Sequence, residues 1–181
     1  TSASYTLTVT ATDDGSPIMN DTATITVEVT NVNEAPTAND NSGSVAENLA
    51  EGQAVATVTS SDPDAGDSVS YTITGGNGSG LFAIDTGGNV TTTGELNFEE
   101  VNNYALTVTA TDTGGLTDTA LVTVNVTNEN EAPIAGDAAG SLAENGSGGD
   151  AVATVSASDP DADDSLSYAI TSGNGSGLFA I

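Results

Sequence analysis

The sequence predicts an all-β protein made of tandem β-sandwich units. Short segments alternate apolar and polar residues, and stretches rich in Gly, Asn, Asp and Ser separate them, which is typical of an antiparallel sandwich. No window carries a helical period. Residues 46–84 recur as residues 143–181 at a spacing of 97, with 29 of 39 positions identical. This spacing indicates one domain-sized unit copied along the chain.

The repeat divides the chain into three parts. The segment Y-T-L-T-V-T-A-T-D at 5–13 recurs with one change at 104–112, and N-E-A-P at 33–36 recurs at 130–133. Residues 1–33 therefore match the second half of a unit, 34–130 form one complete unit, and 131–181 match the first half of the next. We expect a packed central unit between two half-units with exposed strand edges, which favour pairing with another copy.

Seven strands are expected in the complete unit, in the order 42–47, 54–60, 68–74, 81–85, 89–93, 103–111 and 118–127. The third presents Val69, Tyr71 and Ile73 on one face. Phe82 and Ile84 do the same in the fourth, and the Gly-rich segments 75–80 and 86–89 supply turns on either side of it. The last two strands carry the longest apolar faces: Tyr104, Leu106, Val108 and Ala110, and then Val122, Val124 and Val126.

The charge composition excludes many functions. The chain has no Lys, Arg, His or Cys, while 26 residues are Asp or Glu and the net charge is −26. Without cations it has no basic patch for nucleic acid or anionic membrane. Without His or Cys it lacks the usual ligands of zinc, haem and iron–sulfur clusters, as well as thiol and Ser-His chemistry. The oxygen ligands that remain suit Ca²⁺ or Mg²⁺.

The acidic residues have two interpretations. The first is a solvated surface that keeps an exported protein soluble. The second is neutralisation by bound cations, since no basic residue offsets the repulsion between the carboxylates. The composition is typical of a bacterial protein exported to the cell surface or medium. No run of 18 apolar residues occurs, so no membrane-spanning helix is expected.

Acidic motifs recur at the ends of the expected strands: A-E-N at 46–48, D-P-D at 62–64, L-N-F-E at 96–99, Asp112, and N-E-N-E-A-P at 128–133. These motifs, in this order, resemble the cadherin repeat, and more narrowly the cadherin-like repeats of large bacterial surface proteins. The resemblance implies a seven-stranded Greek-key sandwich with Ca²⁺ bound in the joint between successive units.

The resemblance also implies the ligands of each joint. The joint after the complete unit would use Glu47, Asn97, Glu99, Asn128, Asn130 and Glu131, with Asp159 and Asp161 from the next unit. The joint before it would use Asn31, Asn33 and Glu34 with Asp62, Asp64 and Asp112. Asn stands where the family has Asp at positions 31, 97 and 128, so a lower calcium affinity is expected.

Each motif also has an ordinary interpretation. Asp-Pro-Asp is a good turn, Ala-Glu-Asn could be a solvated strand entry, Glu100 could replace Glu99 as the ligand, and Glu34-Ala35-Pro36 could be only a stiff linker. Residues 62–73 begin like an EF-hand loop, but Ile73 occupies the position of the final Glu. The glycine-rich segment 75–80 begins like a nonapeptide calcium repeat without iterating.

The leading functional hypothesis is a stretch of a long adhesive or structural array whose joints are stiffened by Ca²⁺. Its partners would be neighbouring repeats, and self, another surface protein or a glycan. The alternative is a passive or carbohydrate-binding sandwich of a secreted enzyme, which requires an exposed platform among seven aromatic residues, most of which are expected in the core. An enzyme is not expected, because adjacent carboxylates such as Glu99 and Glu100 point to opposite faces of a strand.

Overall fold

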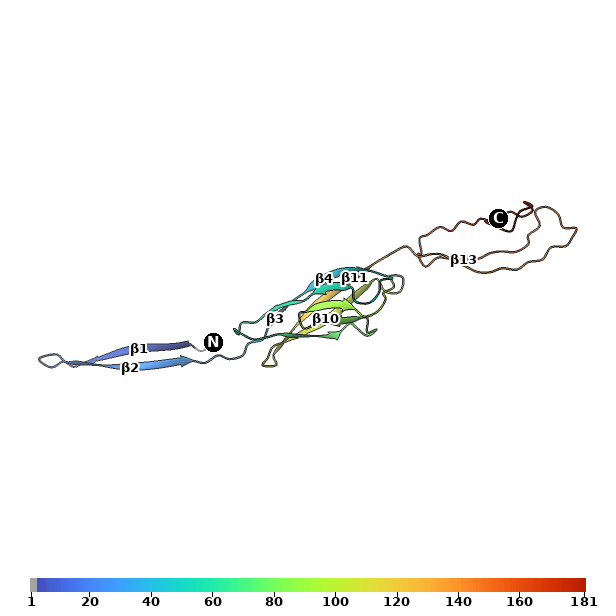
Figure 1. Cartoon of the computed structure of the whole chain (residues 1–181). Helices are drawn as coiled ribbons and strands as arrows, with labels where there is room; N and C mark the ends of the chain where they lie inside the picture. Colours follow the sequence, from blue (N-terminus) through green and yellow to red (C-terminus); the bar gives the residue numbers. More distant parts are fainter. Residues whose placement is uncertain (1–2) are drawn as a thin grey trace.

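The computed structural model describes residues 3–181, and all regular secondary structure in this range is β. A hairpin, a packed body and an open C-terminal segment follow one another along the molecule (Figure 1). Residues 3–181 contain no helix of the length and apolarity needed to cross a bilayer.

The packed body contains two main sheets. The first has the order β4 (Asn41–Ala46), β11 (Thr117–Thr127), β10 (Asn103–Thr111) and β7 (Ser70–Gly75). In this sheet β4 runs parallel to β11 and the other pairs are antiparallel. The second sheet has the order β5 (Ala54–Thr57), β9 (Asn89–Thr92) and β8 (Phe82–Ile84), and a short pair joins β3 (Thr37–Asn39) to β6 (Thr59–Ser61).

The core lies between these sheets and comes from the predicted apolar faces. Leu106 and Val108 on β10 are fully buried, as are Val122 and Val124 on β11. Leu121, on the opposite face of β11, is 46% exposed. Phe82 and Tyr104 meet edge to face at 5.0 Å between ring centroids, a favourable aromatic geometry. The predicted all-β sandwich is confirmed.

The strand expected at 54–60 is divided in two. Val58 is buried, and its NH donates to the Gly88 carbonyl at 2.8 Å. At this residue the chain leaves its partner β9 and joins β3, a strand that the sequence did not predict. Gly88 has φ +81°, and a Cβ there would lie 2.2 Å from the Val58 carbonyl oxygen. Only glycine fits this crossing.

Each half-unit forms only those strand pairs in which both strands belong to the same half of the repeat. The N-terminal half keeps β1 (Ala3–Thr12) and β2 (Asn20–Val29), the counterparts of β10 and β11. The C-terminal half keeps β12 (Ile134–Ala135) and β13 (Ala157–Ser158), the counterparts of β3 and β6. The other strands of the complete unit pair across the two halves or with β9, so their counterparts lack partners in the half-units.

Candidate metal centre

A buried carboxylate lies at the end of β4. Glu47 is 0% exposed. Its Oε2 accepts a hydrogen bond from the NH of Phe98 at 2.6 Å, and its Oε1 accepts one from the NH of Glu129 at 2.9 Å. Phe98 lies in the connection between β9 and β10, and Glu129 follows β11. Because both donors are backbone groups, they fix the carboxylate where β4 and β11 leave the sandwich.

Two further carboxylates meet Glu47 there. One carboxylate oxygen from each of Glu47, Glu99 and Glu131 lies within 4.8 Å of the others. Glu131 Oε1 accepts a hydrogen bond from the amide of Asn48 at 2.9 Å. Its Oε2 is buried and has no hydrogen-bond partner within residues 3–181. The sequence contains no Lys, Arg or His, so no side-chain cation of this chain can compensate the cluster.

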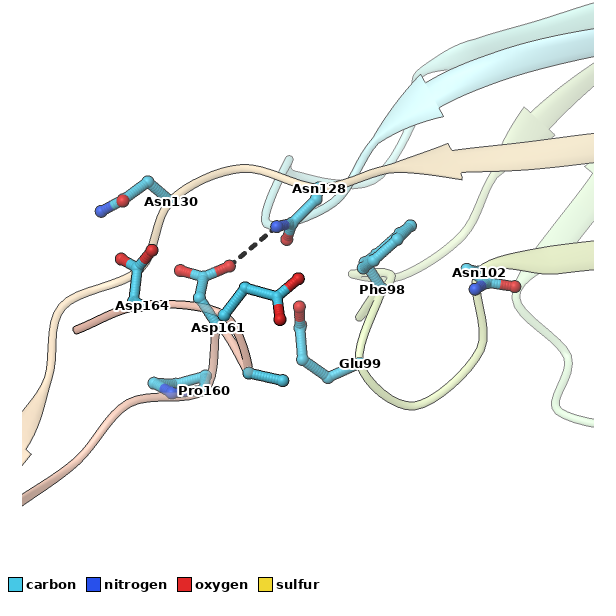
Figure 2. Close-up of a pocket in the computed structure, with 10 residues that line it drawn as sticks. Phe98, Glu99, Asn102, Asn128, Asn130, Pro160, Asp161 and Asp164 are labelled. Carbon is cyan, nitrogen blue, oxygen red and sulfur yellow. Dashed lines mark hydrogen bonds between the residues drawn. The ribbon is translucent and has the colours of Figure 1, made fainter.

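Asp161 comes to this cluster from the next unit. Its Oδ1 accepts from the Asn128 amide and its Oδ2 from the Glu131 NH, both at 2.8 Å. The hydrogen bond from the Glu131 NH, followed by that from Asn128, holds the pKa of Asp161 below its ordinary value, because both stabilise the charged form. Figure 2 shows the bond to Asn128 and Glu99 pointing toward Asp161 from the preceding unit.

The carboxylates surround a hollow between the units. It has a volume of about 420 Å³, and its lining includes Phe98, Glu99 and Asn130 of one unit and Asp161 and Asp164 of the next. Loss of solvation, followed by the charges of Glu47, Glu131 and Asp161, raises the pKa of Glu99. The joint therefore penalises the ionised form of Glu99 and has the electrostatic character of a cation site.

The preceding joint repeats these contacts 97 residues earlier. Asp64 accepts from the side-chain amide of Asn31, and from the NH of Glu34 at 2.8 Å. The bond from Asn31, followed by that from Glu34, lowers the pKa of Asp64. Asp62, Asp64 and Asp67 each place a carboxylate oxygen within 4.8 Å of the other two. The Oδ2 atoms of Asp62 and Asp67 are buried without a hydrogen-bond partner in the described part of the chain.

Asp112 joins this site from the loop that follows β10. The Asn33 amide donates to Asp112 Oδ2 at 2.8 Å, and the NH of Leu116 donates to Asp112 Oδ1 at 2.8 Å. A Cβ on Gly114 would lie 2.4 Å from Asn33 Nδ2. The small residue in this loop therefore lets the linker asparagine reach the carboxylate.

The structure brings most of the expected residues together. In the second joint, hydrogen bonds or carboxylate proximity connect Glu47, Glu99, Asn128, Glu131, Asp159 and Asp161. In the first joint, they connect Asn31, Asn33, Asp62, Asp64 and Asp112, with Glu34 contributing its NH.

Two expected residues behave differently. Asn97 Oδ1 accepts from the NH of Glu100 at 2.7 Å and so supports its own turn. Asn130 lines the hollow, but its amide donates to the Glu131 carbonyl at 3.1 Å.

Two residues of the acidic clusters were not predicted. Asp67 joins Asp62 and Asp64, and Asp164 joins Asp159 and Asp161. The signal was present in the sequence, since Asp recurs at this position in D-P-D-A-G-D and D-P-D-A-D-D. The turn brings it back, with the NH of Asp67 donating to the Asp64 carbonyl at 3.1 Å and that of Asp164 to the Asp161 carbonyl at the same distance.

The family model described as "Cadherin domain" matches residues 41–127, which include both main sheets and Glu47, Glu99 and Asp112. Residues 41–127 form a cadherin domain. This confirms the cadherin-like fold, and the cadherin domain lies between the two acidic joints described above.

Whole-chain comparisons reach beyond the cadherin domain. The chain is 34% identical over 204 residues to "Protein dachsous" of Drosophila melanogaster, an alignment covering 97% of this chain and 6% of that protein. It is 39% identical over 189 residues to human "Protocadherin-16", covering 99% of this chain and 6% of that protein. The chain thus spans about one twentieth of the length of the curated relatives it matches.

The chain is also similar to solved structures of protocadherin extracellular domains. The protocadherin gamma B4 extracellular domain is similar with a TM-score of 0.69 and 31% identity, covering 87% of this chain and 26% of that one. Protocadherin gamma B7 domains 3–6, described as a cis-dimer structure, match with a TM-score of 0.62 and 30% identity, covering 73% of this chain and 34% of that one. The relatives named here are animal proteins, so they give no support to the bacterial origin expected from composition.

Proposed function

We propose that this chain is a stretch of an extracellular repeat array in which Ca²⁺ bound at the joints holds successive sandwich units in line. Its role is adhesive or that of a structural spacer. The cadherin domain supports this proposal, as does the similarity to extracellular protocadherin domains. The proposal also includes two features of the repeat: the complete unit spans residues 34–130, and it is a seven-stranded Greek-key sandwich.

The observation that carries the proposal is the composition of the second joint. A fully buried Glu47 lies with Glu99 and Glu131 in one cluster, and Asp161 reaches the same hollow from the next unit. The Oε2 atom of Glu131 is buried without a hydrogen-bond partner in the described part of the chain, which is energetically costly, and the chain has no basic residue to neutralise it. These donors fit a hard divalent cation, since Ca²⁺ accepts six to eight oxygens in flexible geometry.

The residues that would hold calcium come from both sides of each joint. In the second joint they are Glu47, Glu99, Glu131 and Asp161, with Asn128, Asn130 and Asp159 beside them. In the first they are Asn31, Asn33, Glu34, Asp62, Asp64 and Asp112. When bound, calcium would supply the positive charge that the sequence lacks. The chain's own contribution is orientation, because backbone NH groups already fix the carboxylates of Glu47, Asp64 and Asp161.

The asparagines set the expected strength of the sites. Asn31 and Asn128 donate to Asp64 and Asp161, and each offers a carbonyl oxygen without a formal charge. Fewer charges favour the weaker range of calcium sites, about 10⁻⁴–10⁻³ M in extracellular modules. The adhesion partner is proposed to be a second array or another surface molecule, by analogy with the protocadherin whose structure is a cis-dimer.

Calorimetric titration of the 181-residue chain tests the metal site. We expect Ca²⁺ to bind and the variant Asp161→Asn to lower its affinity about tenfold or more, because the change removes a charge held by two hydrogen bonds. The matched control is Asp137→Asn, an exposed residue of the same half-unit, which should leave affinity unchanged. Equal calcium affinity in all three proteins, or no calcium binding to the wild type, would contradict the site.

A further inference from the structure

Asparagine amides face carboxylates at the second joint. The sequence contains no Lys, Arg, His or Trp, so the side-chain N–H donors of this chain are all neutral amides. Asn48 donates to Glu131 Oε1 at 2.9 Å, and Asn128 donates to Asp161 Oδ1 at 2.8 Å. These two amides therefore satisfy carboxylates for which the chain has no basic partner.

The following unit is attached to the linker 128–131 through Asp161. Its Oδ1 accepts from the Asn128 amide and its Oδ2 from the Glu131 NH, both at 2.8 Å. Asp161 is buried, so little water competes for these oxygens. Both oxygens of one carboxylate are thus engaged by donors of the linker.

The preceding unit is attached to the same linker through Asn48. Asn48 is the one non-glycine residue with a positive φ in the described part of the chain, at +57°, a left-handed conformation that asparagine adopts more readily than most residues. Its NH donates to the Leu96 carbonyl at 3.2 Å, and its side chain binds Glu131. Beside it, the Glu129 NH donates to Glu47 Oε1 at 2.9 Å. Each side of the linker is therefore held by one side-chain amide and one backbone NH.

The first joint repeats the attachment of the following unit. Asn31 donates to Asp64, and the Glu34 NH donates to Asp64 Oδ2 at 2.8 Å. These are the same two kinds of donor that engage Asp161, at positions 97 residues earlier. An arrangement that recurs at both joints is a property of the repeat rather than of one linker.

A carboxylate at position 128 could not make this contact. An ionised Asp side chain only accepts hydrogen bonds, so Asp at position 128 would place an oxygen beside Asp161 Oδ1 with no proton between the two. Carboxylates this close repel unless a cation screens them. Asparagine therefore replaces a negative charge with a hydrogen-bond donor at this position.

We infer that Asn48 and Asn128 form a latch that closes the second joint without calcium, because their amides hold the linker 128–131 on both neighbouring units. Asn31 does the same for the following unit at the first joint. The inference rests on the proposed function of the joints and adds that calcium tightens a contact that the chain itself makes. Removal of calcium then loosens the joint without detaching the linker from either unit.

Distances between two spin labels across the second joint test the latch. The chain has no cysteine, so Thr119→Cys in the complete unit and Thr154→Cys in the next, both at exposed positions, give specific labelling sites. In EDTA we expect a defined distance distribution from the labelled chain. Asn128→Asp and Asn128→Ala should both broaden it, because each removes the amide donor. Asn48→Gly should broaden it too, since glycine keeps the positive φ and loses only the amide.

Calcium titration of the same variants separates the latch from the metal ligands. Asn128→Asp adds a charge and should raise calcium affinity about tenfold, although it opens the latch in EDTA. Asn128→Ala removes the donor and the carbonyl oxygen together and should lower calcium affinity. A residue that only stabilised the fold would lower calcium affinity in both variants.

The matched control for added charge is Asn125→Asp on β11. It keeps the oxygen that accepts from the Asn103 amide at 2.9 Å, so its distance distribution in EDTA should match that of the wild type. The melting transition of the complete unit should be the same in the Asn128 variants, since Asn128 follows the last strand of that unit.

The comparison in EDTA decides the latch whether or not calcium binds. Asn128 variants with the wild-type distance distribution would overturn the inference, and so would an Asn125→Asp variant that broadens it as much as Asn128→Asp. A wild-type chain that binds no calcium would contradict the proposed function and leave the result in EDTA unchanged.

Discussion

Replacing Glu47 with glutamine is expected to abolish most of the thermal stabilisation that calcium gives this protein. An ion that binds only the folded state at about ten times its Kd contributes about 1.4 kcal/mol, which corresponds to a rise in Tm of about 6 °C or more for a unit of this size. Glu47 is fully buried and held by two backbone NH groups. In the Glu47→Gln variant, a neighbouring mobile carboxylate cannot readily take the fixed position of the Glu47 carboxylate at the metal site.

The matched control is Glu51→Gln, which makes the same chemical change at an exposed position of the same segment. Melting curves in EDTA and in millimolar Ca²⁺ should show the wild-type rise in Glu51→Gln and little of it in Glu47→Gln. If Glu47→Gln retains the full calcium-dependent rise, this carboxylate is not part of the metal centre.

The second large effect concerns the core. Replacing Leu106 with alanine is expected to lower the free energy of unfolding by about 2–5 kcal/mol, because the side chain is fully buried between the sheets and its removal leaves a cavity. Leu121→Ala on the adjacent strand removes the same atoms from a side chain that is 46% exposed, and should cost less than about 1 kcal/mol.

Urea denaturation followed by circular dichroism measures both changes. The midpoint should fall strongly for Leu106→Ala and slightly for Leu121→Ala, with unchanged slopes, since the surface exposed on unfolding is nearly the same. Equal losses in the two variants would mean that β10 and β11 do not present these faces to the core as described.

Much of this fold could be predicted because strand periodicity is local. The expected ranges for β10 and β11 agree with the observed strands to within one residue. The division at Val58 could not be predicted, because it depends on the distant carbonyl of Gly88 and on a partner strand, β3, only three residues long. The unpaired state of the half-units follows from topology, since most strand pairs cross from one half of a unit to the other.

The candidate site was predictable to the extent that its residues lie in repeated motifs. The 97-residue spacing placed Asp64 and Asp161 in equivalent joints, where they accept equivalent hydrogen bonds. Asn97 shows the limit of this reasoning, because a local turn engages its side-chain oxygen. Asp67 was missed because the expected D-x-D motif ended three residues earlier, whereas the turn after it returns the chain to the cluster.

Small-angle X-ray scattering of the dilute, monomeric chain tests the central claim most directly. In millimolar Ca²⁺ the scattering should match the extended arrangement of hairpin, cadherin domain and C-terminal segment in Figure 1. In EDTA the joint carboxylates repel without a counter-charge, so the distribution of dimensions should broaden and its mean should change. Identical scattering curves in Ca²⁺ and in EDTA would contradict the proposal that calcium stiffens the joints.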